Sequence, residues 1–248
     1  MCADSPGLPR IALTATDSTN AEALRRARDG EAGPLWITAD TQSSGRGRGG
    51  NTWVSEPGNL YATLLLREPS LPRVASQLAF VGGLAVHDAL AACAPILRPS
   101  LTLKWPNDLL CDGRKLAGVL IEAENTPAFA VALGIGINCV SHPIDAAYPA
   151  TDLRSQGAHI SAEQVFAALA GVMQVRLAQW RKGPGFASIR VDWLQRAAGL
   201  GEPIKVRLPD RQLAGRFCGV DQAGCLMLET AGGAETIAAG DVFALGVA

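Results

Sequence analysis

A segment rich in glycine and arginine, residues 44–53, most constrains the folds open to this chain. Its glycines let the backbone approach a ligand and expose successive N–H groups, while Arg46 and Arg48 place positive charges beside them. The segment lacks the spacing of a P-loop, and it lies between two apolar, strand-forming stretches instead of opening a helix. We therefore expect an anion site, but in a fold that is neither a P-loop fold nor a dinucleotide-binding fold.

Taken alone, the same segment has two other interpretations. It is compatible with a flexible hairpin tip whose arginines are solvated, and with an RNA-binding module in which Trp53 stacks on bases while Arg46 and Arg48 contact phosphates. The charge balance counts against nucleic acid, because 22 Lys and Arg residues accompany 23 Asp and Glu residues, a formal net charge of −1. Neighbouring motifs have to decide between these readings.

The chain around this segment predicts an α+β fold with a mixed, largely antiparallel sheet. The polar run at residues 17–20 is suited to N-cap a helix over residues 21–28. Apolar spacing predicts three more helices, of which the first should be buried and amphipathic, over residues 76–94, 162–180 and 189–197. Strands are expected at residues 34–39, 60–66, 101–105, 116–122 and 129–137. An Asp112-Gly113 turn should join the third and fourth of these strands.

From about residue 201 the pattern changes to short β-prone runs at residues 204–208, 213–220 and 225–228, separated by turns. We expect a small β-barrel there, of marginal size to be stable alone. The predicted division is a catalytic domain at residues 1–199 and a barrel domain at residues 200–248.

Composition narrows the class of protein further. With 48% apolar residues and no basic, apolar leader at the amino end, the chain predicts a well-cored cytoplasmic protein. The longest mainly apolar run, residues 128–140, falls short of the roughly 20 residues that span a membrane. The six cysteines lack zinc-ligand spacing and are expected to be reduced packing thiols.

A second concentration of reactive groups lies at residues 104–108, Lys-Trp-Pro-Asn-Asp, where a strand ends at a proline. The plain alternative is a capped strand end with a surface turn. If the Asp112-Gly113 turn reverses the chain, Lys115 returns to the side that carries Lys104 and Asp108. Such a cluster suits adenylyl transfer, because lysines offset charge on the α-phosphate while a carboxylate holds Mg²⁺ or orients the nucleophile.

Four motifs in this order resemble those of biotin–protein ligases. They are Gly45-Arg46-Gly47-Arg48-x-Gly50-x-x-Trp53, Lys104-Trp105-Pro106-Asn107-Asp108, Arg114-Lys115-Leu116-Ala117-Gly118 and Gly134-Ile135-Gly136-Ile137-Asn138. The resemblance covers about residues 11–248. It implies a catalytic fold like that of class II aminoacyl-tRNA synthetases and biotin synthetases, followed by an SH3-like barrel.

The resemblance also implies roles for individual residues. Those expected to bind biotin are Ser18, Thr19, Asn20, Gln42, Arg46, Gly47, Arg48 and Lys115. Those expected to bind ATP or the adenylate are Arg46, Arg48, Trp53, Lys104, Asn107, Asp108, Lys115 and Asn138. Lys115, Arg48, Lys104 and Asp108 would carry catalysis, with Asp108 as a Mg²⁺ ligand. The side-chain chemistry agrees with these implied roles, because the ureido ring of biotin needs hydrogen-bond donors and acceptors whereas a phosphate needs cations.

The implied activity is two-step biotinylation, in which biotin and ATP form biotinyl-5′-adenylate and a lysine of a carrier domain then accepts the biotinyl group. The expected carrier is a biotin carboxyl carrier domain of acetyl-CoA or pyruvate carboxylase. Lipoate or octanoate attachment is the related alternative. Gly49 and Asn51 replace arginines of some relatives, which predicts weaker phosphate affinity. About ten residues precede Ile11, so we expect no DNA-binding domain, and the family allows a monomer or a homodimer.

Overall fold

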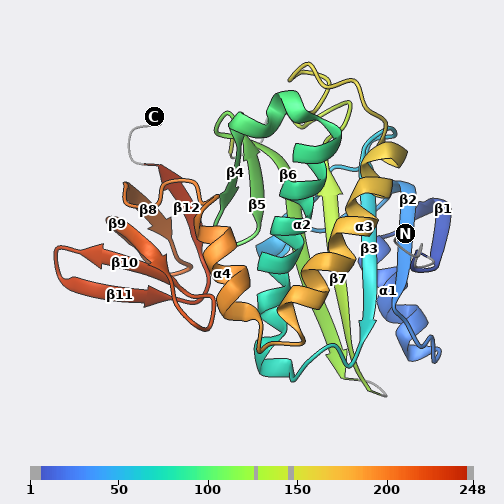
Figure 1. Cartoon of the computed structure of the whole chain (residues 1–248), viewed down its shortest axis with the longest axis horizontal. Helices are drawn as coiled ribbons and strands as arrows, with labels where there is room; N and C mark the ends of the chain where they lie inside the picture. The colour runs from blue at the N-terminus through green and yellow to red at the C-terminus, as the bar shows by residue number, and fades with distance from the viewer. Residues whose placement is uncertain (1–6, 126–127, 145–147, 245–248) are drawn as a thin grey trace, which may run out of the picture.

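A computed structural model describes residues 7–125, 128–144 and 148–244, and its centre is a seven-stranded sheet (Figure 1). In sheet order the strands are β1 (Arg10–Thr16), β2 (Leu35–Gln42), β3 (Leu60–Arg67), β7 (Phe129–Ile137), β6 (Arg114–Asn125), β5 (Asp108–Cys111) and β4 (Leu101–Lys104). Only the β1–β2 pair is parallel, so the predicted mixed, largely antiparallel sheet is confirmed.

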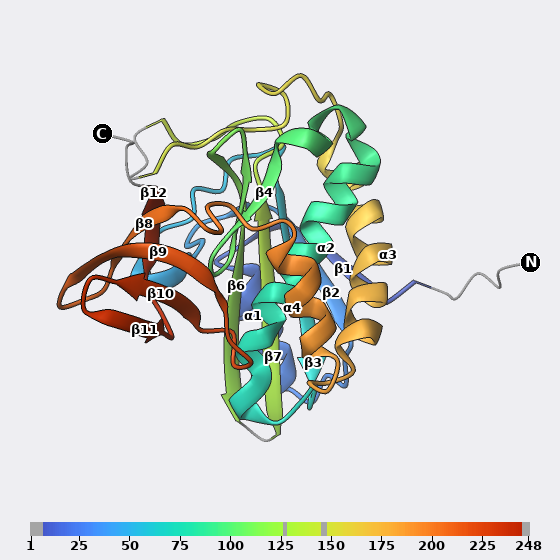
Figure 2. The ribbon, with the colours of Figure 1, turned by 60° about the vertical axis from the view of Figure 1, so that its left-hand side comes forward.

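Helices cover both faces of this sheet (Figure 2). One face carries α1 (Thr19–Arg28), whose Ala23, Leu24 and Ala27 form a small core with β2, β3 and β7. The other face carries α2 (Leu78–Cys93), α3 (Ala162–Trp180) and α4 (Phe186–Leu194), which enclose the main core. Short 3-10 turns lie at η1 (Arg48–Gly50), η2 (Pro72–Gln77) and η3 (Pro95–Ser100).

Helix α2 differs from the amphipathic helix that its sequence predicts. Most of its residues are buried, because α3 and α4 pack over the side that does not contact the sheet. Within the described residues, Pro72–Cys93 is the one helical stretch long and apolar enough to cross a membrane, and 78% of the apolar 18-residue window within it is buried inside the protein.

Two further expectations need correction. Residues 101–105 and 116–122 do not pair directly, because Asp108–Cys111 forms the unpredicted strand β5 between them. The Asp112-Gly113 turn therefore joins β5 to β6, with Asp112 at φ 47° and Gly113 at φ 73°. Helix α4 also begins and ends three residues earlier than predicted. The described cysteines are free thiols; Cys111 and Cys139 are buried, as expected of packing residues, whereas Cys218 is exposed, and Cys2 lies outside the described residues.

The carboxyl-terminal part forms a five-stranded sheet in the order β11-β10-β9-β8-β12 (Figure 1). Its strands are β8 (Pro203–Arg207), β9 (Gln212–Val220), β10 (Leu226–Thr230), β11 (Gly233–Ile237) and β12 (Asp241–Ala244). Three of them were predicted, whereas β11 and β12 were not. Ile204, Phe217 and Leu226 of this sheet belong to the main core, so the two parts share one apolar interior.

Candidate active site

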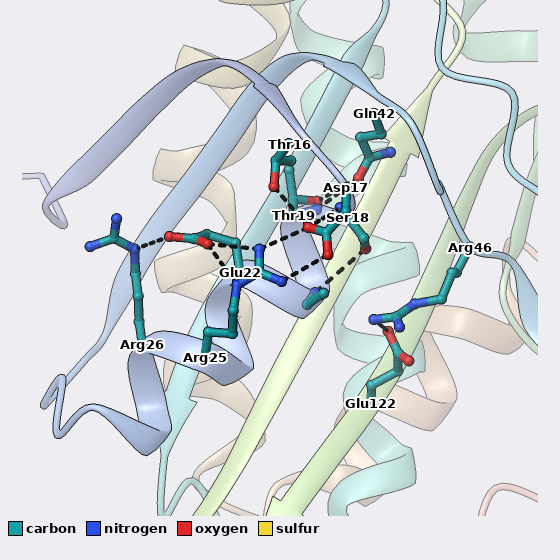
Figure 3. A network of polar contacts seen from close by, with 11 residues as sticks. Thr16, Asp17, Ser18, Thr19, Glu22, Arg25, Arg26, Gln42, Arg46 and Glu122 are labelled. Atoms are coloured by element: carbon teal, nitrogen blue, oxygen red, sulfur yellow. Dashed lines mark hydrogen bonds and ion pairs between the residues drawn. The ribbon is translucent and has the colours of Figure 1, made fainter.

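The amino end of α1 forms one wall of a pocket. Ser18 N-caps the helix, its hydroxyl accepting the Ala21 N–H at 3.5 Å, and Ser18, Thr19 and Asn20 are all buried. Asp17 fixes the turn by accepting the Ser18 N–H at 2.7 Å, and Arg25 donates to both of its carboxylate oxygens at 2.8 Å (Figure 3). Arg25 holds the pKa of Asp17 well below its usual range, so this support stays charged at neutral pH.

Hydrogen bonds fix the polar side chains along this wall. The Gln42 carbonyl accepts the Thr19 N–H at 2.8 Å, and its amide donates to the Ser55 hydroxyl at 2.9 Å. The Thr63 hydroxyl lies 2.7 Å from the Asn20 carbonyl oxygen and can donate to it. Because a backbone N–H can only donate, the orientation of the Gln42 amide follows from its partners. Ser55 and Thr63 escaped the sequence prediction, since only the folded sheet brings them here.

Glycines of β6 and β7 leave room for the pocket. A Cβ at Gly136 would come within 2.5 Å of Cε2 of Trp53, and one at Gly118 within 3.0 Å of Cζ3 of the same ring. A Cβ at Gly134 would collide with the Asn20 side chain. The Gly-Ile-Gly motif therefore allows an indole and an amide to lie directly on the sheet. The Trp53 indole and the glycines line about 470 Å³ of space that is partly open to solvent.

A cluster of charges lies beside the pocket, where β4, β5 and β6 meet. Asp108 contacts Lys115 Nζ through Oδ1 at 2.7 Å and Lys104 Nζ through Oδ2 at 3.3 Å. Lys104 Nζ also lies 3.7 Å from the centre of the Tyr148 ring. Burial lowers the pKa of Lys104, and Asp108 opposes that shift. The predicted convergence of the two lysines and the carboxylate is confirmed.

The glycine–arginine loop connects β2 to β3 and turns through Gly49 at φ 64° and Gly50 at φ 81°, which favours glycine at both positions. Arg46 forms an ion pair with Glu122 of β6 at 3.0 Å (Figure 3). Arg48 Nη1 lies 3.4 Å from Oδ1 of Asn107 and 3.5 Å from the carbonyl oxygen of Gly240. The loop thus lies over the pocket and also contacts the carboxyl-terminal sheet.

The structure brings most predicted binding residues to one pocket. Those that line it are Ser18, Thr19, Asn20, Gln42, Arg46, Gly47, Trp53, Asn107 and Lys115. Lys104 and Asp108 lie behind Lys115, and Arg48 lies on the outer part of the loop. Asn138 is buried and donates to the Thr151 carbonyl at 2.9 Å, so in this structure its side chain supports a neighbouring segment. Residues that the sequence did not single out include Glu122, Tyr148 and Phe243.

The predicted metal ligand, Asp108, has both oxygens in contact with lysine ammonium groups. Within the described ranges there is no group of three or more His, Cys, Asp or Glu residues that could hold a metal ion. Asp108 and the acidic residues in the described ranges therefore do not form a Mg²⁺ site made of protein ligands alone.

Comparison with known proteins places these features in a family. Residues 12–138 match the biotin/lipoate A/B protein ligase family, and residues 199–245 match the biotin protein ligase C-terminal domain. The chain belongs to this ligase family. The match covers the pocket, the charged cluster and the five-stranded sheet, so the family and the fold predicted from the sequence are both confirmed.

Similar proteins cover nearly the whole chain. A biotin–[acetyl-CoA-carboxylase] ligase of Paracoccus denitrificans is 42% identical over 240 residues, which span 93% of this chain and 98% of that protein. A protein of the same name from Mycobacterium tuberculosis is 33% identical, over 92% of this chain and 85% of its own length. The structure of an Aquifex aeolicus biotin protein ligase in complex with biotin and ATP is 28% identical, covers 95% of this chain and 97% of that one, and matches with a TM-score of 0.79.

Proposed function

We propose that this ligase joins biotin to ATP and then transfers the biotinyl group to a lysine of a carrier protein. The observation that carries the proposal is the position of Lys115, whose ammonium group lies between the polar pocket and Asp108. The names of the relatives support biotin as the acyl group and ATP as the activating nucleotide.

In the first step, a biotin carboxylate oxygen attacks the α-phosphorus of ATP, the bond to the bridging oxygen breaks, and pyrophosphate leaves. Lys115 is placed to offset the negative charge that gathers on the carboxylate and the α-phosphate, and Lys104 adds a second positive charge behind it. Asp108 holds both ammonium groups in position. The product is the mixed anhydride biotinyl-5′-adenylate.

In the second step, the amine of the carrier lysine attacks the acyl carbon, an amide forms, and AMP leaves with the electron pair of the broken acyl–oxygen bond. Arg46, Gly47 and Arg48 would cover the adenylate and keep water from hydrolysing it. The proposed carrier is a biotin carboxyl carrier domain of acetyl-CoA or pyruvate carboxylase. Mg²⁺ would enter with the ATP phosphates, because it retains waters and binds phosphates readily.

Polar pocket chemistry favours biotin over lipoate. Ser18, Thr19, Asn20 and Gln42 present donors and acceptors that match a ureido ring. A dithiolane ring or an alkyl chain offers no hydrogen-bonding groups to such polar side chains and would displace their water without replacing it, which penalises binding. Lipoate or octanoate attachment is therefore not favoured, and calorimetry with biotin and lipoate in parallel separates the alternatives.

The function is tested by pyrophosphate release from the purified chain with biotin, Mg²⁺ and ATP. Release should depend on biotin, and Lys115→Ala should lower its rate by roughly 100-fold or more, because charge stabilisation in the transition state is lost. Lys182→Ala removes an exposed lysine beyond α3 and serves as the matched control. Biotin-independent release by the wild type, or full activity of Lys115→Ala, contradicts the proposal.

A further inference from the structure

Glu122 joins the wall of the pocket to the loop that covers it. Its Oε2 atom accepts the Asn20 side-chain N–H at 2.8 Å. The same oxygen lies 3.0 Å from Nη2 of Arg46, and Figure 3 shows this ion pair. Asn20 belongs to α1, Arg46 to the glycine–arginine loop and Glu122 to β6, so one carboxylate oxygen connects three separate elements. Neither the family motifs nor the charge pattern of the sequence assigns a role to Glu122.

The contact with Asn20 sets which way its amide faces. Asn20 Nδ2 donates to Glu122 and, at 3.4 Å, to the Leu120 carbonyl oxygen. The Asn20 carbonyl then faces the Thr63 hydroxyl. Because a carboxylate and a carbonyl can only accept, Glu122, as the nearer acceptor, and the Leu120 carbonyl exclude the flipped amide, in which oxygens would face each other. The hydrogen-bonding pattern that the pocket offers to a ligand therefore depends on Glu122.

The contact with Arg46 holds the loop by charge. The Glu122 and Arg46 side chains are 28% and 43% exposed, so water screens this ion pair and its strength is modest. A weak pair exchanges readily for a ligand that offers Arg46 a bidentate anion, such as the two non-bridging oxygens of an adenylate phosphate. Glu122 can thus hold the loop in the free enzyme without preventing its rearrangement around an anion.

We propose that Glu122 is a positioning residue that orients Asn20 for the acyl substrate and holds Arg46 until the phosphate of the acyl-adenylate replaces it. The adenylate rests on the function proposed above. The contacts of Glu122 in the free enzyme do not depend on that function. Glu122 acts through Asn20 and Arg46 and takes no part in bond making.

Trypsin provides a direct test, because it cleaves after Arg46 and Arg48 when the loop leaves its position. Glu122→Gln keeps an acceptor for Asn20 but loses the charge that holds Arg46. Cleavage of the free enzyme at these sites should accelerate roughly two- to fivefold, the range expected for a screened ion pair. Glu124→Gln is the matched control, since Glu124 lies on the same strand and pairs with Arg28 of α1 instead.

A double-mutant cycle tests whether the effect passes through Arg46. In an Arg46→Gln background, adding Glu122→Gln should leave the cleavage rate after Arg48 unchanged. With biotin and ATP bound as the adenylate, wild type and Glu122→Gln should be equally protected. Additive effects, or cleavage of Glu122→Gln at the wild-type rate in the free enzyme, overturn the proposal. If wild type forms no adenylate, the proposed function fails while the free-enzyme comparison still decides the role of Glu122.

Steady-state kinetics separates the two contacts. Glu122→Gln should leave the KM for biotin within roughly twofold of wild type, because its carbonyl still accepts from Asn20. Glu122→Ala should raise that KM by roughly tenfold, since the Asn20 amide loses a charged partner. A kcat loss with unchanged KM in both variants would contradict a positioning role for Glu122 toward Asn20. Melting temperatures of all variants show whether each one is folded.

Discussion

Lys104 keeps its ammonium group in a buried setting where little water reaches it. Its neighbours are the Asp108 carboxylate and the face of the Tyr148 ring, whereas Lys182 and Lys205 are exposed. Burial lowers the pKa of Lys104, and the carboxylate opposes the shift only in part. Lys115 lies on the other side of the same carboxylate, so one acidic group balances two cations. The two ammonium groups thus share one contacting carboxylate, an arrangement that suits the binding of a further anion.

Removing the Asp108 carboxylate should destabilise the protein, because the positive charges of Lys104 and Lys115 would then lack a contacting negative charge. Asp108→Asn leaves Lys104 and Lys115 without their shared counter-charge, and we expect it to lower the free energy of unfolding by about 3 kcal/mol. ATP should recover part of the loss, because its phosphates replace the missing charge. Thermal unfolding with and without nucleotide measures both effects. Asp112→Asn changes an exposed acid in the β5–β6 turn and should have little effect, and equal ATP-induced shifts in Asp108→Asn and wild type would contradict the argument.

At the scale of elements, the segment after β7 sets the position of the Lys115 backbone. The Lys115 N–H donates to the Pro149 carbonyl at 2.7 Å, and the Thr151 N–H donates back to the Lys115 carbonyl at 2.9 Å. Asp152 supports this segment by accepting from the Ser155 N–H at 2.7 Å and contacting Nδ1 of His142 at 2.6 Å. A buried carboxylate thereby holds the segment that positions the backbone of Lys115.

The support from Asp152 should depend on pH. Burial raises the pKa of Asp152. Its hydrogen bonds to Ser155 and His142 together lower the pKa by more than burial raises it, so the pKa lies below the ordinary value. A lowered carboxylate pKa adds stability at pH above the ordinary value, and this stability is lost as the pH falls through the folded-state pKa. Asp152→Asn should lower the free energy of unfolding by about 2 kcal/mol at neutral pH. This gap in free energy between wild type and Asp152→Asn should close below about pH 4.

Urea unfolding between neutral and acid pH measures this gap directly. The exposed Asp210→Asn variant, in the turn between β8 and β9, should show no gap at any pH. A difference between wild type and Asp152→Asn that persists undiminished at low pH would mean that packing, and not charge, is the contribution of Asp152.

A feature of this structure could be predicted from the sequence when the residues that form it lie close together in the chain. The Ser18 cap, the turn at Asp112 and the convergence of Lys104 with Lys115 follow from residues close in the chain, and the structure confirms them. Glu122 was missed because its partners belong to α1 and the loop, and only the pairing of distant strands brings these together. Strand β5 was missed because four residues beside a turn give little periodic signal.

For the whole molecule, the notable feature is that two sheets share one interior. Trp105 donates its indole N–H to the Gly224 carbonyl at 3.0 Å, and Arg190 donates to the Val220 carbonyl at 2.9 Å. A Cβ at Gly224 would come within 2.9 Å of the Phe80 ring, so the two parts meet without a gap. The proposed division into residues 1–199 and 200–248 separates chain segments, but the packing joins them.

Such packing predicts that both parts unfold together. All tryptophans precede residue 200, so tryptophan fluorescence reports on the first part, while pulse labelling of Cys225 reports on the second. The two probes should give the same urea midpoint, as expected for a single cooperative unit. A lower midpoint for Cys225 labelling would show that the carboxyl-terminal sheet opens independently.

The start of α1 serves two purposes, since Ser18 begins a helix and also faces the substrate pocket. A mutation of Ser18 that alters ligand preference keeps the helix start only if the new side chain can also N-cap, as Thr, Asn and Asp do. Natural selection for folding and natural selection for substrate choice therefore act on the same few codons. A lineage of such enzymes would inherit its substrate together with its architecture, and a protein engineer who seeks a new acyl group should first stabilise the helix by other means.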